Sequence, residues 1–358
     1  MRIDIVDPAA YTPPYDHALC AALARAGAQV RLQTSAFDYG DVPAAEGYER
    51  VERFYRLPAP PHGRRMARVA QHPVDMLRYR RAARDADVVH FQWLALQQLD
   101  VHLLPKRPRV LTAHDVLPRE PSPGQRAAQR RLYERMDAVV VHSEHGRGRL
   151  IGELGLDPAL VHVIPHGVLD ALTHVDPVLP AELPEPDRPV VLFFGLIRPY
   201  KGLDVLLEAW EGISDAELWV VGMPRIDITE LRARAPAGVR WVPRFVSDAE
   251  AAACFRRAEL VVLPYREIDQ SGVLYTALGF GTPLVLSDVG GFGEVAAQGA
   301  AAVVPPGDPA ALHAELRRLL DDAVTREELT AAAQAAAAGP YAWGPIAERT
   351  LELYGAVS

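Results

Sequence analysis

The sequence predicts an α/β protein built from two Rossmann-like, doubly wound domains with parallel sheets. Three observations support this fold class: short apolar runs alternate with Ala- and Leu-rich segments, this rhythm restarts after a Pro-rich stretch, and the two halves differ in charge. Near-continuous apolar strands separated by helices are typical of parallel sheets that are covered on both faces. Ligands of such sheets bind beyond the carboxyl ends of the strands, so we expect the two domains to face a ligand cleft.

Six apolar runs predict the strands of the first domain, which we place at residues 1–172. In chain order they are RIDIVD (2–7), AQVRLQT (28–34), ADVVHFQW (86–93), RVLTAHD (109–115), DAVVVHS (137–143) and LVHVIPHG (160–167). Each is bounded by charged or turn-forming residues, and helical Ala/Leu patterns lie between several of them, as expected for strand–helix–strand units.

A second set of strands follows the Pro-rich segment DPVLPAELPEPDRP (176–189), and we therefore predict a linker at residues 173–188. The runs are PVVLFFG (189–195), AELWVVG (216–222), GVRWVPRFV (238–246), AELVVLPY (258–265) and TPLVLSDVGG (282–291). They predict a second domain at residues 189–338. The remaining tail, residues 339–358, is expected to form a terminal helix.

Composition and charge exclude several classes of protein. The chain of 358 residues is 49% hydrophobic and 23% charged, as expected for a folded protein with two cores. Through residue 172 it carries 23 Arg and Lys against 20 Asp and Glu; the remainder carries 15 against 26. The overall charge of −8 argues against a nucleic-acid partner. Two cysteines in separate halves and a Pro-rich, polar N-terminal segment favour a cytoplasmic protein.

The stretch FFGLIRPYKGLDVLLEAW (193–210) predicts an anion site. Gly195 ends a strand, and Arg198 and Lys201 stand before a helix that begins near Gly202. Cations are unfavourable at the positive end of a helix dipole unless an anion joins them. A diphosphate fits this arrangement. The alternative is a pair of solvated surface cations, although Lys201 is one of only two lysines in the chain.

A second candidate anion site lies in LPYREIDQSGVLYTALGFGTP (263–283). A strand ends near Tyr265, and Ser271 is expected to be the N-cap of an apolar helix, with Gly272 allowing close approach to its backbone. Ordinary helix capping is the alternative, and it is the commoner role of such a pair.

Two basic segments and one acidic residue have simple alternatives to a binding role. Residues 61–84 hold seven arginines against Asp75, and residues 112–131 add further basic side chains. The first segment suits an anionic lipid surface, although a solvated helix or loop is the commoner explanation of such a segment. The second suits an anionic acceptor or the phosphates of a ligand. Asp16, beside His17, is explained most simply as an acidic residue in the first turn of a helix.

At this point the motifs carry a resemblance to a known family. The segments FFGLIRPYKGLDVLLEAW, VVLPY…QSGVL…ALGFGTPLVLSDVGGFGE, TAHD and IPHGV resemble the family-four retaining glycosyltransferases of GT-B fold, the relatives of glycogen synthase and phosphatidylinositol mannosyltransferase, in the branch that carries QSG. Their order and spacing cover most of the chain. The resemblance implies that the terminal helix returns to the first domain.

The resemblance also implies roles for particular residues. Arg198 and Lys201 would hold the donor diphosphate, His114 would lie beside the transferred sugar, and Glu294 would bond the sugar hydroxyls. The remaining residues implied at the donor site are Gly195, Ser271, Gly272 and Val273.

Two departures from the family pattern stand out. The family carries two glutamates eight positions apart; here Ile268 and Thr276 fill these positions, with Glu267 and Asp269 flanking the first. A shift of one residue would supply a carboxylate, and Thr276 would offer a hydroxyl to the ribose. The family's glycine-rich loop is also absent. Tyr11, Thr12 and Asp16 occupy its place on the acceptor side, so we expect distinctive acceptor recognition.

The resulting hypothesis is a retaining hexosyl-type glycosyltransferase that needs no metal or cofactor. Its co-substrate would be a nucleotide-diphosphate sugar, with UDP or GDP favoured, and its acceptor a hydroxyl of a saccharide, glycolipid or small molecule. Peripheral contact with the inner face of the membrane is compatible with the basic segments. A nucleotide-sugar epimerase of the same fold and a noncatalytic nucleotide-sugar-binding subunit stay open as alternatives. The sequence sets neither the linkage formed nor the oligomeric state.

Overall fold

The computed structural model describes all residues except 38–39, 41, 59–62, 95 and 118–123. The chain forms two compact units. Unit 1 comprises Met1–Gly167 together with Trp343–Ser358, and unit 2 comprises Val168–Ala342. Residues 173–188, which the sequence marks as Pro-rich, are grouped with unit 2 by their contacts.

Unit 1 is built on a seven-stranded sheet with the order β3-β2-β1-β4-β5-β6-β7. Every neighbouring pair in it is parallel. The strands are β1 (Arg2–Asp7), β2 (Gln29–Thr34), β3 (Glu49–Glu52), β4 (Val88–Phe91), β5 (Arg109–Thr112), β6 (Ala138–Val141) and β7 (Val161–Val163). The order reverses at β1, so the chain winds outward in both directions from the centre of the sheet.

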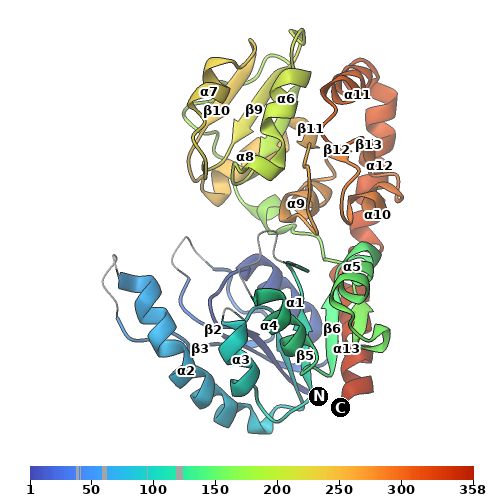
Figure 1. The fold of residues 1–358 in the computed structure, drawn as a ribbon. Helices are drawn as coiled ribbons and strands as arrows, with labels where there is room; N and C mark the ends of the chain where they lie inside the picture. The colour runs from blue at the N-terminus through green and yellow to red at the C-terminus, as the bar shows by residue number, and fades with distance from the viewer. Residues whose placement is uncertain (38–39, 41, 59–62, 95, 118–123) are drawn as a thin grey trace. The chain divides into compact units, whose positions relative to one another are not determined.

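Helices cover both faces of this sheet (Figure 1). One face packs against α2 (Arg64–Ala82), α3 (Gln97–Leu103), α4 (Gln125–Tyr133) and α5 (Glu144–Leu154). The other packs against α1 (Pro13–Arg25) and α13 (Trp343–Val357). Successive strand residues point to opposite faces, which is why a fully buried strand such as β6 is apolar on both sides.

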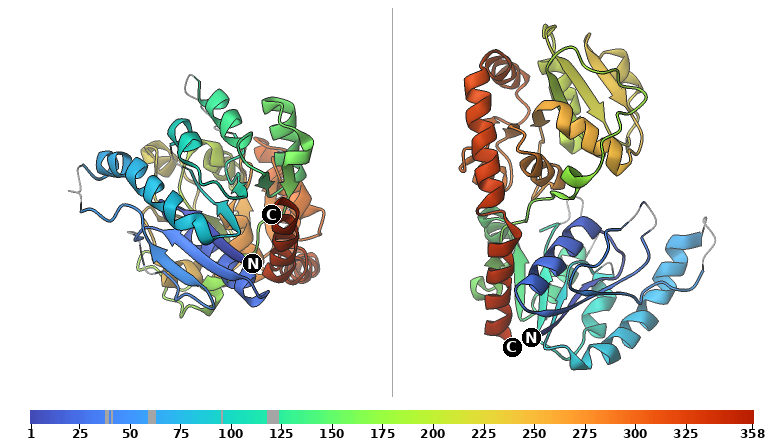
Figure 2. Two further views of the ribbon diagram at one scale, coloured as in Figure 1. Left: turned by 90° about the horizontal axis from the view of Figure 1, so that it is seen from below. Right: turned by 180° about the vertical axis from the view of Figure 1, so that it is seen from behind.

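The C-terminal helix α13 completes one face of unit 1. It lies beside α1, as the right-hand view of Figure 2 shows. Its buried residues Trp343, Ile346 and Tyr354 belong to the same core cluster as Ile3 and Ile5 of β1. Trp343 packs so closely on Gly167 that a Cβ there would lie 2.4 Å from the indole ring.

Unit 2 holds a six-stranded parallel sheet with the order β10-β9-β8-β11-β12-β13. Its strands are β8 (Val190–Phe194), β9 (Glu217–Val221), β10 (Val239–Val242), β11 (Ala258–Leu263), β12 (Leu284–Ser287) and β13 (Ala301–Val304). One face packs on α8 (Asp248–Arg257), α9 (Gly272–Phe280), α10 (Phe292–Ala296) and α12 (Ala323–Ala338). The other packs on α6 (Leu203–Ala209), α7 (Thr229–Ala233) and α11 (Pro309–Asp321).

Short 3-10 turns connect these elements. They are η2 (Ala83–Asp85), η3 (Pro158–Leu160), η4 (Ala171–His174) and η5 (Pro199–Lys201). The expected fold class of two doubly wound parallel α/β domains is confirmed. All eleven expected strands are present, and the structure adds the two edge strands β3 and β13.

Candidate active site

The turn after β8 places a buried cation against the backbone. Gly195 has φ +100° and its amide donates to the Val221 carbonyl at 2.9 Å. A Cβ at Gly195 would lie 3.0 Å from the Nζ of Lys201, so glycine leaves room for the ammonium group. Lys201 is 7% exposed, and its Nζ lies 5.0 Å from the centre of the Tyr265 ring, within the range of a cation–π contact.

Lys201 lacks a carboxylate partner among the residues that the structure describes. Burying an ammonium group without an opposite charge is costly, and one aromatic face offsets that cost only in part. Such a residue is well suited to meet an anion that comes from outside the protein.

Arg198 stands at the start of η5, in extended conformation and exposed to solvent. Within the described part of the chain it forms no ion pair, in contrast to Arg266 nearby. Arg266 holds Asp204 through two hydrogen bonds and donates to the Pro199 carbonyl at 2.9 Å. Arg266 therefore fixes the turn, and Arg198 and Lys201 remain available for a ligand.

The turn from η5 into α6 requires glycine. Gly202 has φ +65°, and a Cβ on it would lie 2.0 Å from the carbonyl oxygen of Pro264. No other residue fits there without moving the backbone. This close approach joins the loop after β8 to the loop after β11.

The amino end of α9 lies beside the same turn. Val273 Cγ2 lies 3.4 Å from the position of a Cβ on Gly195. Ser271 occupies the N-cap position, as expected, but its hydroxyl makes no capping bond and lies 3.5 Å from the Tyr265 hydroxyl. The first amides of α9, at Gly272 and Val273, are therefore not capped by this side chain. Gly195, Lys201 and the start of α9 form one site at the carboxyl edge of the sheet.

The other residues expected to bind the nucleotide sugar are Glu267, Asp269, Thr276 and Glu294, and they differ in how exposed they are to solvent. Thr276 is 7% exposed and its hydroxyl donates to the Gly272 carbonyl at 3.0 Å. Asp269 is buried and Glu267 is exposed, on a loop that Gly290 approaches so closely that a Cβ would lie 1.8 Å from the Ile268 carbonyl oxygen. Glu294 is half-buried in α10.

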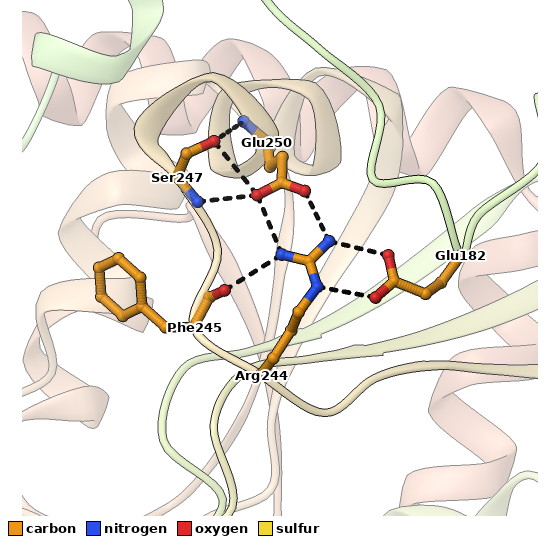
Figure 3. A network of polar contacts seen from close by, with 5 residues as sticks. All are labelled: Glu182, Arg244, Phe245, Ser247 and Glu250. Carbon is orange, nitrogen blue, oxygen red and sulfur yellow. Dashed lines mark hydrogen bonds and ion pairs between the residues drawn. The ribbon is translucent and has the colours of Figure 1, made fainter.

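A loop that follows β10 is held by one arginine (Figure 3). The Arg244 guanidinium binds the carboxylate of Glu182 at 2.7 and 2.8 Å and that of Glu250 at 2.6 and 3.1 Å. It also donates to the Phe245 carbonyl at 3.1 Å. Arg244 lowers the pKa of Glu250 to about 2. The loop at residues 243–247 is thus fixed, with the Phe245 side chain 58% exposed.

In unit 1, His114 follows β5 and lies in an aromatic and polar surround. Its Nε2 is 3.0 Å from Gln92 Oε1, and its Nδ1 is 3.2 Å from Nε2 of His142. Trp93 stacks on its ring, with the ring centres 5.1 Å apart. Burial, followed by the neighbouring histidines, lowers the pKa of His114 well below its usual value, so the ring is neutral at pH 7.

The three expected acceptor-side residues occupy different environments. Tyr11 is 65% exposed and lies 4.4 Å from Trp93 between ring centres. The hydroxyl of Thr12 accepts a hydrogen bond from Trp93 Nε1 at 2.9 Å. Asp16 lies in the first turn of α1 and is 1% exposed. Burial and then the nearby Asp7 carboxyl raise its pKa well above the usual value.

Sequence reasoning missed Gln92, Trp93 and His142, which contact His114 directly. The signal was present, because each follows a strand by one or two residues, at the edge where ligands of parallel sheets bind. The expected strands at residues 86–93 and 137–143 include these three residues, whereas in the structure they follow β4 and β6.

Most of the basic segment at residues 61–84 forms α2, and its last two residues belong to η2; residues 61–62 lie outside the described residues. Its exposed surface mixes Met66, Val69, Val74 and Leu77 with arginines. In the second basic segment, residues 118–123 lie outside the described part. Across the described residues, no helix has the length and apolar character needed to cross a membrane, and no group of three or more His, Cys, Asp or Glu is arranged to hold a metal ion.

Two successive doubly wound units with all-parallel sheets match the GT-B fold, and comparisons with known proteins identify the family. Residues 15–170 match the model for Glycosyltransferase Family 4, and residues 188–322 match that for Glycosyl transferases group 1. The chain belongs to glycosyltransferase family 4.

Individual relatives agree with this assignment. The chain is 30% identical to D-inositol 3-phosphate glycosyltransferase of Kineococcus radiotolerans, over 77% of this chain and 72% of the relative. It is 33% identical to phosphatidyl-myo-inositol mannosyltransferase of Mycobacterium leprae, over 63% of this chain and 61% of that relative. Its fold matches that of Anabaena HepE, solved in complex with UDP, with a TM-score of 0.74 at 17% identity, over 99% of this chain and 100% of that one.

Proposed function

We propose that this glycosyltransferase moves a hexose from a nucleotide-diphosphate sugar to an acceptor hydroxyl with retention of anomeric configuration. The observation that carries the proposal is the buried Lys201, which lies against Gly195 without a carboxylate partner among the described residues and beside the start of α9. Arg198 adds a second cation to the same turn. Together they suit the two phosphates of a departing nucleotide.

The reaction breaks the bond between the anomeric carbon and a phosphate oxygen and forms a bond from that carbon to the acceptor oxygen. Retention follows if the acceptor attacks from the face that the nucleotide leaves, with a phosphate oxygen taking the acceptor's proton. Negative charge grows on the diphosphate as the bond breaks. Lys201, Arg198 and the uncapped amides of α9 would stabilise that charge by fixed cations and dipoles. This arrangement supports a reaction without a metal ion or other cofactor.

UDP or GDP is the proposed nucleotide. Anabaena HepE, whose fold this chain shares, was solved with UDP, and one relative is named a mannosyltransferase. The loop after β10, fixed by Arg244 and Glu250, is the proposed site for the base, which its backbone and the exposed Phe245 would contact. Ser271, Gly272 and Thr276 are proposed to contact the phosphate and ribose, and Glu267, Asp269 and Glu294 to contact the sugar.

The acceptor is proposed to bind unit 1 near His114, with Tyr11 and Thr12 in contact with it. Two of the relatives carry inositol in their names, which suits a cyclic polyol as one class of acceptor. Asp16 would act through the shape of the loop, since its carboxyl group is buried. The basic α2 would bring the enzyme to the inner face of the membrane if the acceptor is a lipid.

Calorimetric titration with UDP, GDP, ADP and TDP tests the donor site. We expect one nucleotide to bind the wild type and to lose affinity at least about tenfold in Lys201→Ala, because a charge-assisted contact contributes about 1.5–3 kcal/mol. The matched control is Lys106→Ala, which removes the other lysine, an exposed residue of unit 1, and should bind normally. Equal binding by both variants, or binding of no nucleotide, would contradict the proposal.

Product analysis then separates the alternatives. A glycosyltransferase releases nucleotide only when an acceptor hydroxyl is present. An epimerase of the same fold would change the sugar without acceptor, and a noncatalytic subunit would bind the nucleotide sugar and release nothing. Release of an inverted product would contradict the proposed stereochemistry.

A further inference from the structure

Four histidines lie along the carboxyl edge of the sheet in unit 1. His90 is the next-to-last residue of β4, and His114, His142 and His166 follow β5, β6 and β7 within three residues. His114 and His142 are joined directly, with Nδ1 of the first 3.2 Å from Nε2 of the second. The hydrogen positions on such a pair are decided by the groups at its two ends.

A backbone carbonyl sets the proton on His142. Its Nδ1 lies 2.9 Å from the carbonyl oxygen of Ile164. A carbonyl oxygen only accepts hydrogen bonds, so Nδ1 of His142 must carry the hydrogen. In a neutral imidazole the other nitrogen then holds a lone pair, and Nε2 of His142 is the acceptor for His114.

The position of the hydrogen on His114 follows from that on His142. Because Nε2 of His142 accepts, Nδ1 of His114 must donate, and Nε2 of His114 is left with a lone pair. That nitrogen lies 3.0 Å from the side-chain amide of Gln92. An acceptor there requires the NH2 end of the amide, so Oε1 and Nε2 of Gln92 must be exchanged relative to their assigned positions.

The environment of Gln92 favours this exchange. The residue is fully buried, and in the assigned orientation its NH2 group has no hydrogen-bond partner among the described residues. The exchange gives one of these hydrogens an acceptor and leaves a carbonyl oxygen unpaired instead. Buried unpaired N–H donors are rarer in proteins than under-satisfied carbonyl oxygens.

The imidazoles of His114 and His142 are both neutral near pH 7. Burial lowers the pKa of His142 to about 4, with the Ile164 carbonyl acting in the opposite direction. Burial and the neighbouring His142, His166 and His90 lower the pKa of His114 well below its usual value.

We propose that His142 and Gln92 are positioning residues that hold His114 as the Nδ1–H tautomer, with its Nε2 lone pair turned to the Gln92 amide as a hydrogen-bond acceptor. The inference deepens the proposed function and rests on it only for the consequence to the substrate. A sugar hydroxyl that takes the place of the Gln92 amide at Nε2 meets an acceptor there, and since this nitrogen carries no hydrogen, His114 does not act as a general acid from it.

Long-range 1H–15N spectra of the 15N-labelled protein test the proposal directly, since they separate protonated from unprotonated ring nitrogens. For wild type at pH 7 we expect His114 with Nδ1 protonated and Nε2 unprotonated, its signals being assigned by their loss in His114→Gln. The opposite tautomer would overturn the proposal. His90, bonded to the Tyr354 and Thr112 hydroxyls, serves as an internal reference for folding.

Two variants test the partners one at a time. Gln92→Glu replaces the donor by a carboxylate, and we expect His114 to become protonated on both nitrogens. If Nε2–H of His114 already donated to Gln92 in the wild type, the His114 tautomer would stay unchanged in this variant, and the proposal would be contradicted. In His142→Phe we expect His114 to lose its Nδ1–H preference, and sugar-transfer turnover to fall about 10–100-fold while nucleotide affinity is retained. An unchanged His114 tautomer in this variant would equally overturn it.

The spectra also keep the two proposals apart. If the protein transferred no sugar, the proposed function would be contradicted. The tautomer of His114 would still be decided by the spectra alone. Transfer activity with a His114 that is protonated on Nε2 only would contradict the positioning role and leave the proposed function intact.

Discussion

The indole ring of Trp93 lies nearly flat on the imidazole of His114, with the two planes inclined by 15° and the ring centres 5.1 Å apart. Trp93 also contacts Tyr11, and its Nε1 donates to the Thr12 hydroxyl. Trp93 is half-buried and contacts two parts of unit 1. One is the loop after β1, which stands where the family has a glycine-rich turn, and the other is His114 after β5.

Replacing Trp93 should impair catalysis more than nucleotide binding. We expect Trp93→Ala to lower kcat/KM for sugar transfer about 10–100-fold, because it would displace His114, which we propose lies near the acceptor, and small displacements of such a group have effects of this size. Trp93→Phe keeps a stacking ring and should recover part of the loss. Trp241→Phe, at a half-buried tryptophan of unit 2, is the matched control. Equal loss in the phenylalanine and alanine variants of Trp93 would contradict a stacking role.

Gly202→Ala should destabilise the protein more than another substitution of a left-handed glycine. Gly202 and Gly212 have φ of +65° and +82°, but only Gly202 has a carbonyl oxygen where its Cβ would lie. Gly212→Ala should cost about 1 kcal/mol for its backbone conformation. Gly202→Ala should cost about 1–3 kcal/mol more for the clash. Urea unfolding measures both, and equal losses would show that the loop after β11 moves aside freely.

Asp16→Asn should change how stability depends on pH. The folded pKa of Asp16 is raised well above its usual value by burial and by Asp7, whereas the unfolded carboxyl titrates near pH 4. As pH rises above about 4 the unfolded chain loses this proton first, so the contribution to stability falls until the folded group also ionises.

Asparagine has no proton to lose there. The free energy of unfolding of Asp16→Asn, measured from pH 4 to pH 8, should therefore rise relative to wild type as the pH increases. Parallel pH profiles for the two proteins would mean that Asp16 titrates as freely in the folded state as in the unfolded chain.

The exposed surface of α2 should bind anionic membranes. It presents Met66 and Leu77, 73% and 44% exposed, among arginines, which combines insertion of apolar groups with attraction to acidic lipids. In liposome sedimentation we expect binding to phosphatidylserine vesicles that weakens with salt and is reduced in Arg65→Glu combined with Arg81→Glu, since each basic residue contributes about 1 kcal/mol. Arg25→Glu, on α1, is the control. Equal binding to neutral vesicles would argue for a solvated helix.

The strands that could be predicted from the sequence are those with continuous apolar runs, and the two that were missed lie at sheet edges. β3 reads ERVE and has no fully buried residue. Edge strands commonly carry charged residues, and these interrupt the apolar run by which a strand is recognised in a sequence. β13 reads AAVV within an alanine-rich stretch that is equally compatible with a helix. Its strand conformation depends on pairing with β12, which a local pattern does not encode.

The candidate site was predictable where spacing along one segment defines it. Gly195, Arg198 and Lys201 fall within seven residues and follow one strand. The burial of Lys201 under Tyr265 was not predictable, because those residues come from separate loops that meet only in the folded sheet. The partners Gln92, Trp93 and His142 likewise come from two other strands, because they follow β4 and β6 whereas His114 follows β5. Contacts between neighbouring strand ends depend on strand order, and the sequence does not state that order.

The C-terminal helix imposes an order on biosynthesis. Unit 1 takes part of its hydrophobic core from α13, yet the 175 residues of unit 2 separate α13 from Gly167. At about 5–20 residues per second, the ribosome needs roughly 10–35 seconds to make the intervening segment. During that interval one face of the first sheet, including Ile3 and Ile5, has α1 but lacks the second of its two covering helices. We therefore expect the nascent chain to be most exposed to aggregation while unit 2 is being synthesised, before α13 is available to unit 1.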